Sequence, residues 1–239
     1  MRDRLRGACR AAAALALFAG VGLAPAASVN DAPSANRVLD RYLGGREVSG
    51  PAPGETVSFE IDASLPKLKK HGIMSGLRGI TAAGRVAFSQ LHFVGDEIIQ
   101  TAVIAKFLTA QAKEVGSAGD LAIDAHNYRF HYKGEGDYDG RPVAVFSTEP
   151  RKRRAGLFKG ELWLDRETSR PLREWGEFVK SPSIFLRNIY FVCDYTPDAA
   201  ESHPRRIILR LNAAFAGPAE LTMWLSAPEP ALATAEGTQ

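Results

Sequence analysis

The sequence is poor in cysteine, which excludes a fold stabilised by disulfides. Only Cys9 and Cys193 occur among its 239 residues, and Cys9 falls in an N-terminal segment that we expect to be removed. Cys193 is then alone in an oxidising compartment and cannot form an internal disulfide. Its place in an apolar, strand-like run favours a small buried residue over a reactive thiol.

The motifs of common enzymes and metal sites are also missing. The chain has no G-x-S-x-G, no H-E-x-x-H, no phosphate-binding loop and no dinucleotide fingerprint. Of its five histidines, His126 and His131 are five residues apart on one expected strand and therefore point to opposite faces. The acidic segment 134–141 lacks the late Glu of a calcium loop, so we interpret Asp139 and Gly140 as a tight hairpin turn. We expect a non-enzymatic protein with no catalytic residue, no metal and no cofactor.

Residues 1–26 have the pattern of a secretory signal peptide. Four arginines precede a short apolar run, which is followed by the cleavage pattern Ala24-Pro25-Ala26. Removing the segment takes away four Arg and one Asp, which leaves 26 of the 30 basic and 26 of the 27 acidic residues. The remaining chain is formally neutral and gives no argument for nucleic-acid binding. We expect a periplasmic protein that is peripheral to the membrane and does not span it.

The stretch 160–179 predicts two β-strands joined by a polar turn. Leu162 and Leu164 alternate with polar or aromatic neighbours, and Pro171 fits only near the start of a strand. We expect Asp165 and Glu167 to lie in this turn, where solvation keeps both ionised. Similar runs on both sides predict one large antiparallel sheet.

Two helices are expected beside this sheet. A short one is predicted after Asn36 as its cap, and a longer one from Asp96 to about Gly116, where Ile99, Val103 and Phe107 recur at helical spacing. The other expected strands are 56–62, 76–81, 84–95, 126–133, 141–148, 183–195 and two near 206–212 and 221–226. We expect one domain over 27–227 and a disordered tail over 228–239.

Two features favour binding. The basic run Arg151-Lys152-Arg153-Arg154 is either a solvated loop that discourages edge pairing or an anion site. Several strands carry large apolar residues on both faces, for example Trp163 beside the leucines of its strand, and Ile184 with Phe185. Either helices cover the second face, or a hollow between sheet and helices holds an apolar ligand.

The motifs resemble a known family. Gly84-x-Val86-x-Phe88, a G-R-P-V-x-V-F strand and the hairpin from Gly160 to Arg173 are similar to segments of the periplasmic lipoprotein-carrier family typified by LolA. Its relatives include the receptor LolB and the RseB-type envelope-stress sensors. The resemblance implies an α+β fold, in which a curved, unclosed antiparallel sheet, a half-barrel, holds helices on its concave face. The hollow between them accepts acyl chains.

The resemblance implies a non-enzymatic periplasmic binder or carrier of an acylated ligand, such as a lipid or lipoprotein on its way to the outer membrane. The alternative is an envelope scaffold or stress-sensor domain that binds a protein partner. For the carrier, we expect Arg151 to Arg154 to make weak contact with the head group. The apolar hollow is expected to be lined by Phe59, Ile61, Phe88, Phe130, Leu162, Leu164, Ile189 and Phe191.

Overall fold

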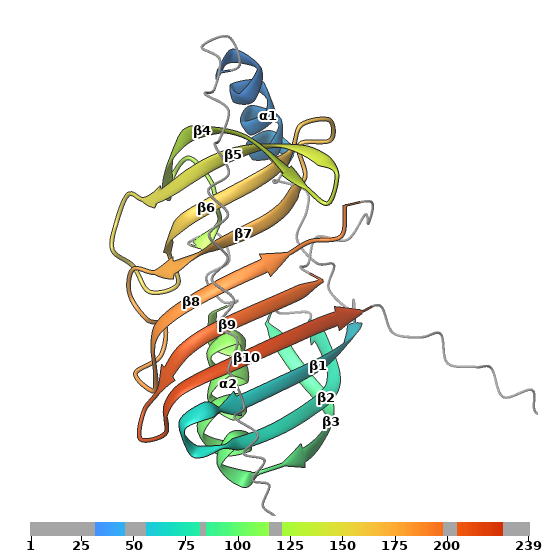
Figure 1. Cartoon of the computed structure of the whole chain (residues 1–239), viewed down its shortest axis with the longest axis vertical. Coiled ribbons are helices and arrows are strands. Elements are labelled where there is room, and N and C mark those ends of the chain that lie inside the picture. Colours follow the sequence, from blue (N-terminus) through green and yellow to red (C-terminus); the bar gives the residue numbers. More distant parts are fainter. Residues whose placement is uncertain (1–31, 46–55, 82–84, 115–120, 198–204, 227–239) are drawn as a thin grey trace, which may run out of the picture.

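The computed structural model describes residues 32–45, 56–81, 85–114, 121–197 and 205–226, and they form one curved antiparallel sheet with helices on one side (Figure 1). The sheet order is β3-β2-β1-β10-β9-β8-β7-β6-β5-β4. Its strands are β1 (Thr56–Leu65), β2 (Lys70–Ile80), β3 (Val86–Gly95), β4 (Tyr128–Tyr138), β5 (Arg141–Pro150), β6 (Phe158–Asp165), β7 (Pro171–Phe178), β8 (Leu186–Asp194), β9 (Arg206–Ala213) and β10 (Gly217–Ser226).

The sheet does not close into a barrel. In the described residues β3 and β4 are its two edges, and neither pairs with the other. The first strand, β1, pairs with the last, β10, with Ile61 opposite Met223, so these two strands lie side by side as the third and fourth from the β3 edge. The α+β half-barrel predicted from the sequence is therefore confirmed. The single-domain boundaries stay a prediction, because 1–26 and 228–239 lie outside the described residues.

Alternation of side chains decides which face of each strand is buried. In β1, Phe59, Ile61 and Ala63 are buried, while Glu60 and Asp62 between them point to the other face. Neighbouring strands repeat this pattern because directly paired residues share a face. The concave face is therefore apolar along most of the sheet.

The turn predicted at Asp139 and Gly140 is confirmed. Both residues have positive φ, 51° and 81°, as a two-residue hairpin turn requires. The acidic segment before it is not a loop, however, because β4 continues through Gly134 to Tyr138. A change of register near Gly134 lets the strand bend and continue.

The basic segment 67–71 joins the first two strands. It holds part of the 3₁₀ turn η2 (Pro66–Leu68) and the start of β2, so β1 and β2 form one hairpin. Lys69 has a left-handed conformation at φ 54° and closes this turn.

The first helix, α1 (Ala32–Gly45), begins earlier than expected. Asn36 is exposed within the helix and does not cap it. The buried side of α1 carries Ala35, Val38 and Tyr42, at spacings of three and four residues. This side packs towards β4 and β6.

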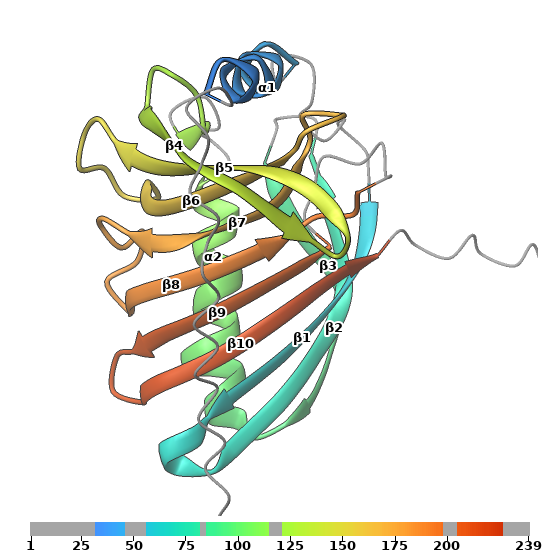
Figure 2. The same ribbon diagram turned by 45° about the horizontal axis from the view of Figure 1, so that its top comes forward.

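The second helical segment begins after Asp96, as predicted. The Asp96 Oδ1 accepts a hydrogen bond of 3.2 Å from the Ile98 amide, which is a capping contact. The segment then runs through a π-helix, η3 (Ile99–Ile104), into α2 (Ala105–Glu114). Figure 2 shows α2 inside the curve of the sheet. The π-turn was not predicted, because a shift from four- to five-residue hydrogen bonding leaves no clear mark in the sequence.

Candidate ligand-binding site

A continuous cluster of buried apolar side chains covers the concave face of the sheet. It contains residues of the central strands and of both edges, together with the inner sides of α1, η3 and α2. The helices and the sheet therefore share one core. On the convex face a smaller cluster is formed by Tyr138, Val143, Val145 and Leu172, with Trp163 packed against it.

This second cluster explains part of the apolar surplus on both strand faces. Trp163 lies opposite Val145 and Arg173, and it covers the convex face of β5 and β7. Ile184 and Phe185 lie before β8 begins and are exposed, so they belong to neither face. The presence of large apolar residues on both faces of a strand is thus not in itself evidence of a hollow.

All eight residues expected to line the hollow belong to the concave cluster or pack against it. Phe88 and Phe130 are only partly buried, and they lie on β3 and β4, the two edge strands. The other six are buried: Phe59, Ile61, Leu162, Leu164, Ile189 and Phe191. The structure therefore distributes the set along the curved face, with one phenylalanine at each open edge.

The aromatic members form two separate groups. Near one edge, the rings of Phe59 and Phe88 meet edge to face, with centroids 5.5 Å apart. Towards the other edge, Phe158 meets Phe191 at 4.8 Å and Tyr128 at 5.4 Å. The Tyr128 hydroxyl accepts a hydrogen bond of 3.2 Å from the Phe158 amide, so the polar end of this buried ring is satisfied.

Sequence reasoning missed Phe158 and Phe178 as members of this second group. The Phe178 ring stacks on Phe191 at 5.2 Å. Phe158 could have been found, because it precedes Leu162 and Leu164 by an even number of residues and therefore shares their face.

The π-helical segment covers the concave face at one end of the half-barrel. It packs on β1, β2 and β3, and α2 continues along β3. Ile99, Val103 and Ile104 are fully buried there. Gly72 permits this close approach, because a Cβ at its position would lie 3.1 Å from the Ile99 Cγ2.

Glu174 and Cys193 are polar side chains on the concave face. Glu174 of β7 is buried, opposite Leu162 on one neighbouring strand and Cys193 on the other. Burial raises the pKa of the Cys193 thiol well above its ordinary value, and the charges of Glu174 and Asp194 raise it further. The thiol therefore stays protonated at neutral pH, which argues against a nucleophilic role.

The basic run lies in the connection between β5 and β6. The Arg151 Nε donates to the carbonyls of Ala125, at 2.8 Å, and Tyr128, at 3.1 Å. Arg153 donates to the Val179 carbonyl at 2.9 Å. These two arginines hold neighbouring connections together, while Lys152 is exposed between them.

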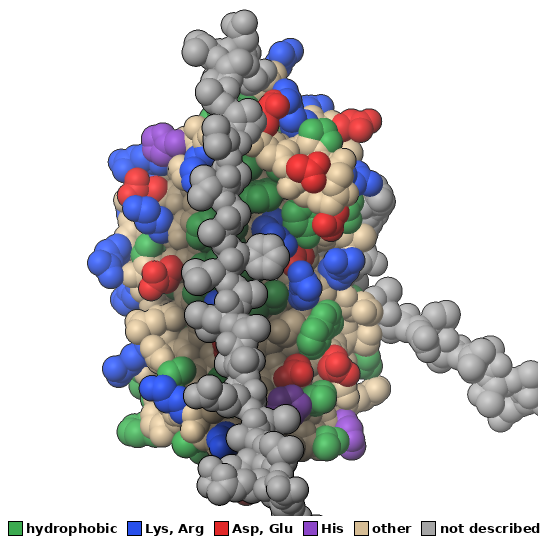
Figure 3. Space-filling view, viewed as in Figure 1, with side chains coloured by type: hydrophobic (Ala, Val, Ile, Leu, Met, Phe, Trp, Pro, Cys, Tyr) green, Lys and Arg blue, Asp and Glu red, His purple; other side chains and the backbone are tan. Residues whose placement is uncertain are grey.

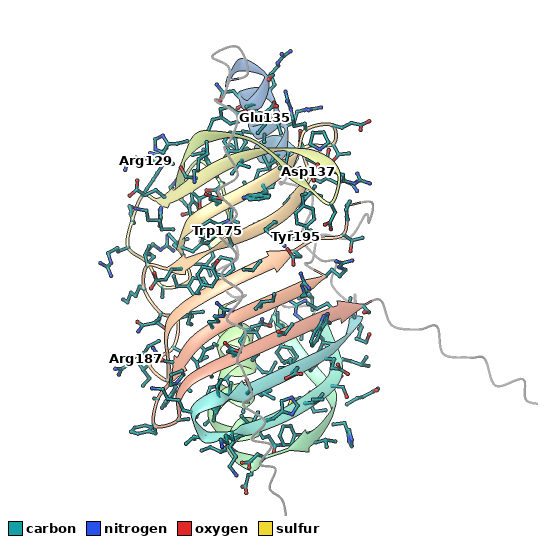
Figure 4. The ribbon with its side chains drawn as sticks, in the orientation of Figure 1. Arg129, Glu135, Asp137, Trp175, Arg187 and Tyr195 are labelled. Atoms are coloured by element: carbon teal, nitrogen blue, oxygen red, sulfur yellow. The ribbon has the colours of Figure 1, made fainter. Side chains whose placement is uncertain are left out.

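A polar network that was not predicted lies on the convex face. The Glu161 Oε2 accepts hydrogen bonds from the indole nitrogens of Trp163, at 3.0 Å, and Trp175, at 3.1 Å, and Lys133 pairs with its other oxygen. Burial works to raise the pKa of Glu161, but these hydrogen bonds outweigh it and hold the pKa below its ordinary value. Trp175 is labelled in Figure 4. The carboxylate therefore fixes two large side chains over the sheet.

Beside it, Asp194 forms the most buried ion pairs among the described residues. Its side chain has no exposed area, and it accepts hydrogen bonds from the Nε atoms of Arg173, at 2.7 Å, and Arg206, at 3.0 Å. The Tyr138 hydroxyl donates to it at 3.2 Å. The Arg173 guanidinium also lies 4.9 Å from the centre of the Tyr138 ring.

Asp165 differs from its expected solvated state. It is buried, and its Oδ1 accepts hydrogen bonds from the amides of Glu167, at 2.9 Å, and Thr168, at 2.8 Å. Burial works to raise its pKa, but these backbone hydrogen bonds and Arg141 lower it below its ordinary value. Hydrogen bonds from the β6–β7 turn thus keep Asp165 ionised, and not contact with water. The same hydrogen bonds hold the turn in place.

A groove of about 540 Å³ lies between α1 and this turn, lined by Ser34, Arg37, Val38, Asp40, Arg41 and Arg166. Arg41 is engaged there, since it donates to the carbonyls of Arg166, at 3.1 Å, and Glu167, at 3.3 Å. These contacts attach α1 to the end of the sheet.

Among the described residues, no group of three or more His, Cys, Asp or Glu side chains is placed to hold a metal ion. In the same part of the chain, no helix is long and apolar enough to cross a membrane.

Comparison with known proteins gives similarity of structure only. No protein-family model matches the chain, and no curated protein matches it. The chain is similar to structures of the LolA superfamily. The LolA superfamily protein NE2245 from Nitrosomonas europaea is 15% identical, with a TM-score of 0.38 over 82% of this chain and 94% of that one. A putative outer membrane lipoprotein-sorting protein domain from Vibrio parahaemolyticus is 11% identical, with a TM-score of 0.41 over 84% and 93%.

A third similar structure is MucB of Pseudomonas aeruginosa, in its complex with MucA. It is 14% identical, with a TM-score of 0.25 over 82% of this chain and 94% of that one. At these scores the function has to be argued from the residues of this chain.

Proposed function

We propose that the protein is a non-enzymatic binder, and a carrier, of an acylated or otherwise apolar ligand, which it takes up on the concave face of the sheet. The observation that carries this proposal is the continuous apolar cluster with a partly buried phenylalanine at each open edge, Phe88 on β3 and Phe130 on β4. Each of these two side chains keeps part of its surface accessible beside the cluster.

Apolar contact alone is sufficient for such binding. Each methylene removed from water contributes on the order of 0.8 kcal/mol, so a long acyl chain binds without a strong polar contact. Phe59, Phe158 and Phe191 offer ring faces and edges against which a flexible chain packs.

The helical segment is the element that has to move. Ile99, Val103 and Ile104 occupy the concave face at one end, so a ligand there would replace their contacts with β1, β2 and β3. A π-turn is a strained form of helix, and π-turns are frequent at functional sites. In this proposal η3 and α2 shift outward as a lid while the sheet keeps its shape.

The head group of the ligand stays outside the apolar cluster. Arg151 and Arg153 are already bound to backbone carbonyls, which leaves Lys152 as the most accessible charge of the run. An exposed charge of this kind adds little affinity and less in salt. Affinity is therefore expected to follow chain length rather than head-group charge.

The expected setting is the periplasm. A neutral, exported chain with a closed apolar core suits the transfer of a lipid or lipoprotein towards the outer membrane. The raised pKa of the Cys193 thiol, caused by burial, keeps it protonated, which argues against a nucleophilic cysteine. Delivery would therefore depend on the movement of the lid.

Replacing Phe130 by Asp is expected to reduce uptake of a fluorescent fatty acid by roughly tenfold or more, because a carboxylate placed at the cluster edge must be desolvated. The matched control is Phe215→Asp, which places the same charge on a fully exposed side chain of the β9–β10 turn. Thermal melting establishes that both variants are folded. The measurement is a fluorescence titration with wild type and both variants.

Equal loss in both variants, or no loss in Phe130→Asp, contradicts the proposed site. If the folded wild type binds no acyl probe of any length, the carrier proposal is wrong. The alternative, a scaffold that binds a protein partner through its sheet edge or basic loop, then takes its place.

A further inference from the structure

Four connections join strand ends along one side of the sheet: 66–69, 151–157, 179–185 and 214–216. This row of connections is called the connection edge, as distinct from the edge strands β3 and β4. The four connections are on the same side because consecutive antiparallel strands reverse direction, so every second connection returns to the same edge. In Figure 1 this edge is on the left. Leu157 and Ala216 of these connections belong to the concave cluster, whereas the exposed side chains at their tips lie outside it.

This edge carries exposed apolar side chains at the tips of its connections. Leu68 is 46% exposed, Ile184 76%, Phe185 38% and Phe215 fully. Phe215 also has positive φ, 68°, which is uncommon for an aromatic residue and turns its side chain away from the sheet. Exposed apolar groups that recur on adjacent loops indicate a binding surface.

The same connections are basic. They contain Lys67, Lys69, the run Arg151 to Arg154, and Lys180, and they contain no Asp or Glu. In Figure 3 Lys and Arg side chains predominate along this margin of the molecule, with Asp and Glu side chains among them. Arg187, at the start of β8, lies beside it (Figure 4). Nearby, the acidic side chain of Asp96 is paired with Lys70.

The opposite edge is different. Its described turns, 139–140 and 166–170, mix Asp139 and Glu167 with Arg166 and Arg170. None of the large apolar side chains that are exposed in the described residues lies in these two turns. Among the connections that the structure describes in full, the combination of apolar tips with basic charge is therefore found on one side of the sheet only.

The apolar tips are held in place by the fold. The Ala214 amide donates a hydrogen bond of 2.7 Å to the Phe185 carbonyl, which joins the β9–β10 turn to the β7–β8 connection. The Lys106 Nζ of α2 lies 4.3 Å from the centre of the Phe185 ring. The helical segment is therefore in contact with this edge.

We propose that this edge docks on a lipid bilayer whose surface is anionic, with Phe215 and Ile184 inserted among the lipids and the basic side chains on the head groups. Charge complementarity favours this occupant, since the four connections themselves carry only basic charges; Asp124, Glu149 and Glu177 lie beside them, and Glu149 pairs with Lys159. A bilayer accepts apolar side chains at separate tips, whereas a protein interface needs a contiguous apolar centre. Because Lys106 contacts Phe185, docking would act on the lid at the membrane.

The test is co-sedimentation of the chain, as isolated after export, with vesicles of phosphatidylcholine alone and of phosphatidylcholine mixed with phosphatidylglycerol. We expect binding to the anionic vesicles, weakened by salt because screening shortens electrostatic reach to about 10 Å at 0.1 M. The double variant Ile184→Ser/Phe215→Ser should bind roughly tenfold more weakly or worse. Neutralising Lys67, Lys152 and Lys180 to Gln should remove the preference for anionic vesicles.

Leu91→Ser is the matched control, because it removes an exposed apolar side chain from the middle of β3, away from the four connections. It should bind vesicles like wild type. Absence of vesicle binding, or equal binding by the double variant, overturns the proposal. If the double variant instead loses a cross-linked envelope protein while vesicles are never bound, the edge is a protein interface. Uptake of a fatty acid in solution does not require this edge, so its outcome is independent of this test.

Discussion

Replacing Gly160 by Ala is expected to lower the free energy of unfolding by about 3 kcal/mol. Gly160 of β6 lies opposite Gly176 of β7, and the two strands approach unusually closely there. A Cβ at Gly160 would lie 1.8 Å from the Trp175 carbonyl oxygen and 2.6 Å from the Gly176 Cα. These are backbone atoms, so no rotation of a side chain relieves the overlap and the strands must separate.

Gly44→Ala in α1 is the matched control, because a Cβ there meets nothing within 4 Å. Alanine is the better helix former, so this change is expected to be neutral or to stabilise by up to about 1 kcal/mol. Urea unfolding of both variants measures the difference. If Gly160→Ala unfolds at the wild-type urea concentration, the close approach of β6 and β7 is not a feature of the protein.

Replacing Asp194 by Asn is expected to cost about 2–3 kcal/mol of stability at neutral pH. The side chain is fully buried between Arg173 and Arg206, whose own side chains are 31% and 37% exposed. Removing the charge leaves both guanidinium groups without their carboxylate, but water reaches them and moderates the cost. Glu220→Gln is the control, since its pair with Arg210, at 3.7 Å, is largely exposed and should be worth under about 1 kcal/mol.

The same residue predicts a dependence on pH. Burial works to raise the pKa of Asp194, but the hydrogen bonds and charges of Arg173 and Arg206 outweigh it, so its pKa in the folded state lies below the ordinary value. Its contribution is therefore complete above the ordinary Asp pKa, about 3.9, and is lost as pH falls through the lower pKa of the folded state. Stability of Asp194→Asn should fall less steeply below about pH 4 than that of wild type. Parallel acid profiles in the two proteins would contradict this role.

Local patterns predicted the sheet well because one face of each strand is buried. Alternation around Leu162 and Leu164, and the turn residues Asp139 and Gly140, were sufficient to place β6 and the β4–β5 hairpin. The start of α1 was wrong because Asn36 is a good cap by type, yet the chain is already helical from Ala32. There the packing of Ala35 and Val38 on the sheet outweighs the capping preference of Asn36.

The candidate site was predicted in part. The inward residues were found because strand alternation decides their face, whereas Phe158 and Phe178 were missed at the ends of their strands. The environment of Asp165 was wrong, because a short acidic side chain in a polar turn is usually solvated, and here the turn folds back over it. The Asp194 network joins residues far apart in sequence, and only the pairing of β7, β8 and β9 brings them together.

Native mass spectrometry of the protein purified from its own envelope tests the central claim most directly. The concave cluster, which reaches the edge strands at Phe88 and Phe130, predicts a bound species with the mass of an acylated molecule, and its loss in the folded Phe130→Asp variant. A wild-type spectrum that contains only the polypeptide mass, from a protein that melts cooperatively and binds no added acyl probe, would contradict it.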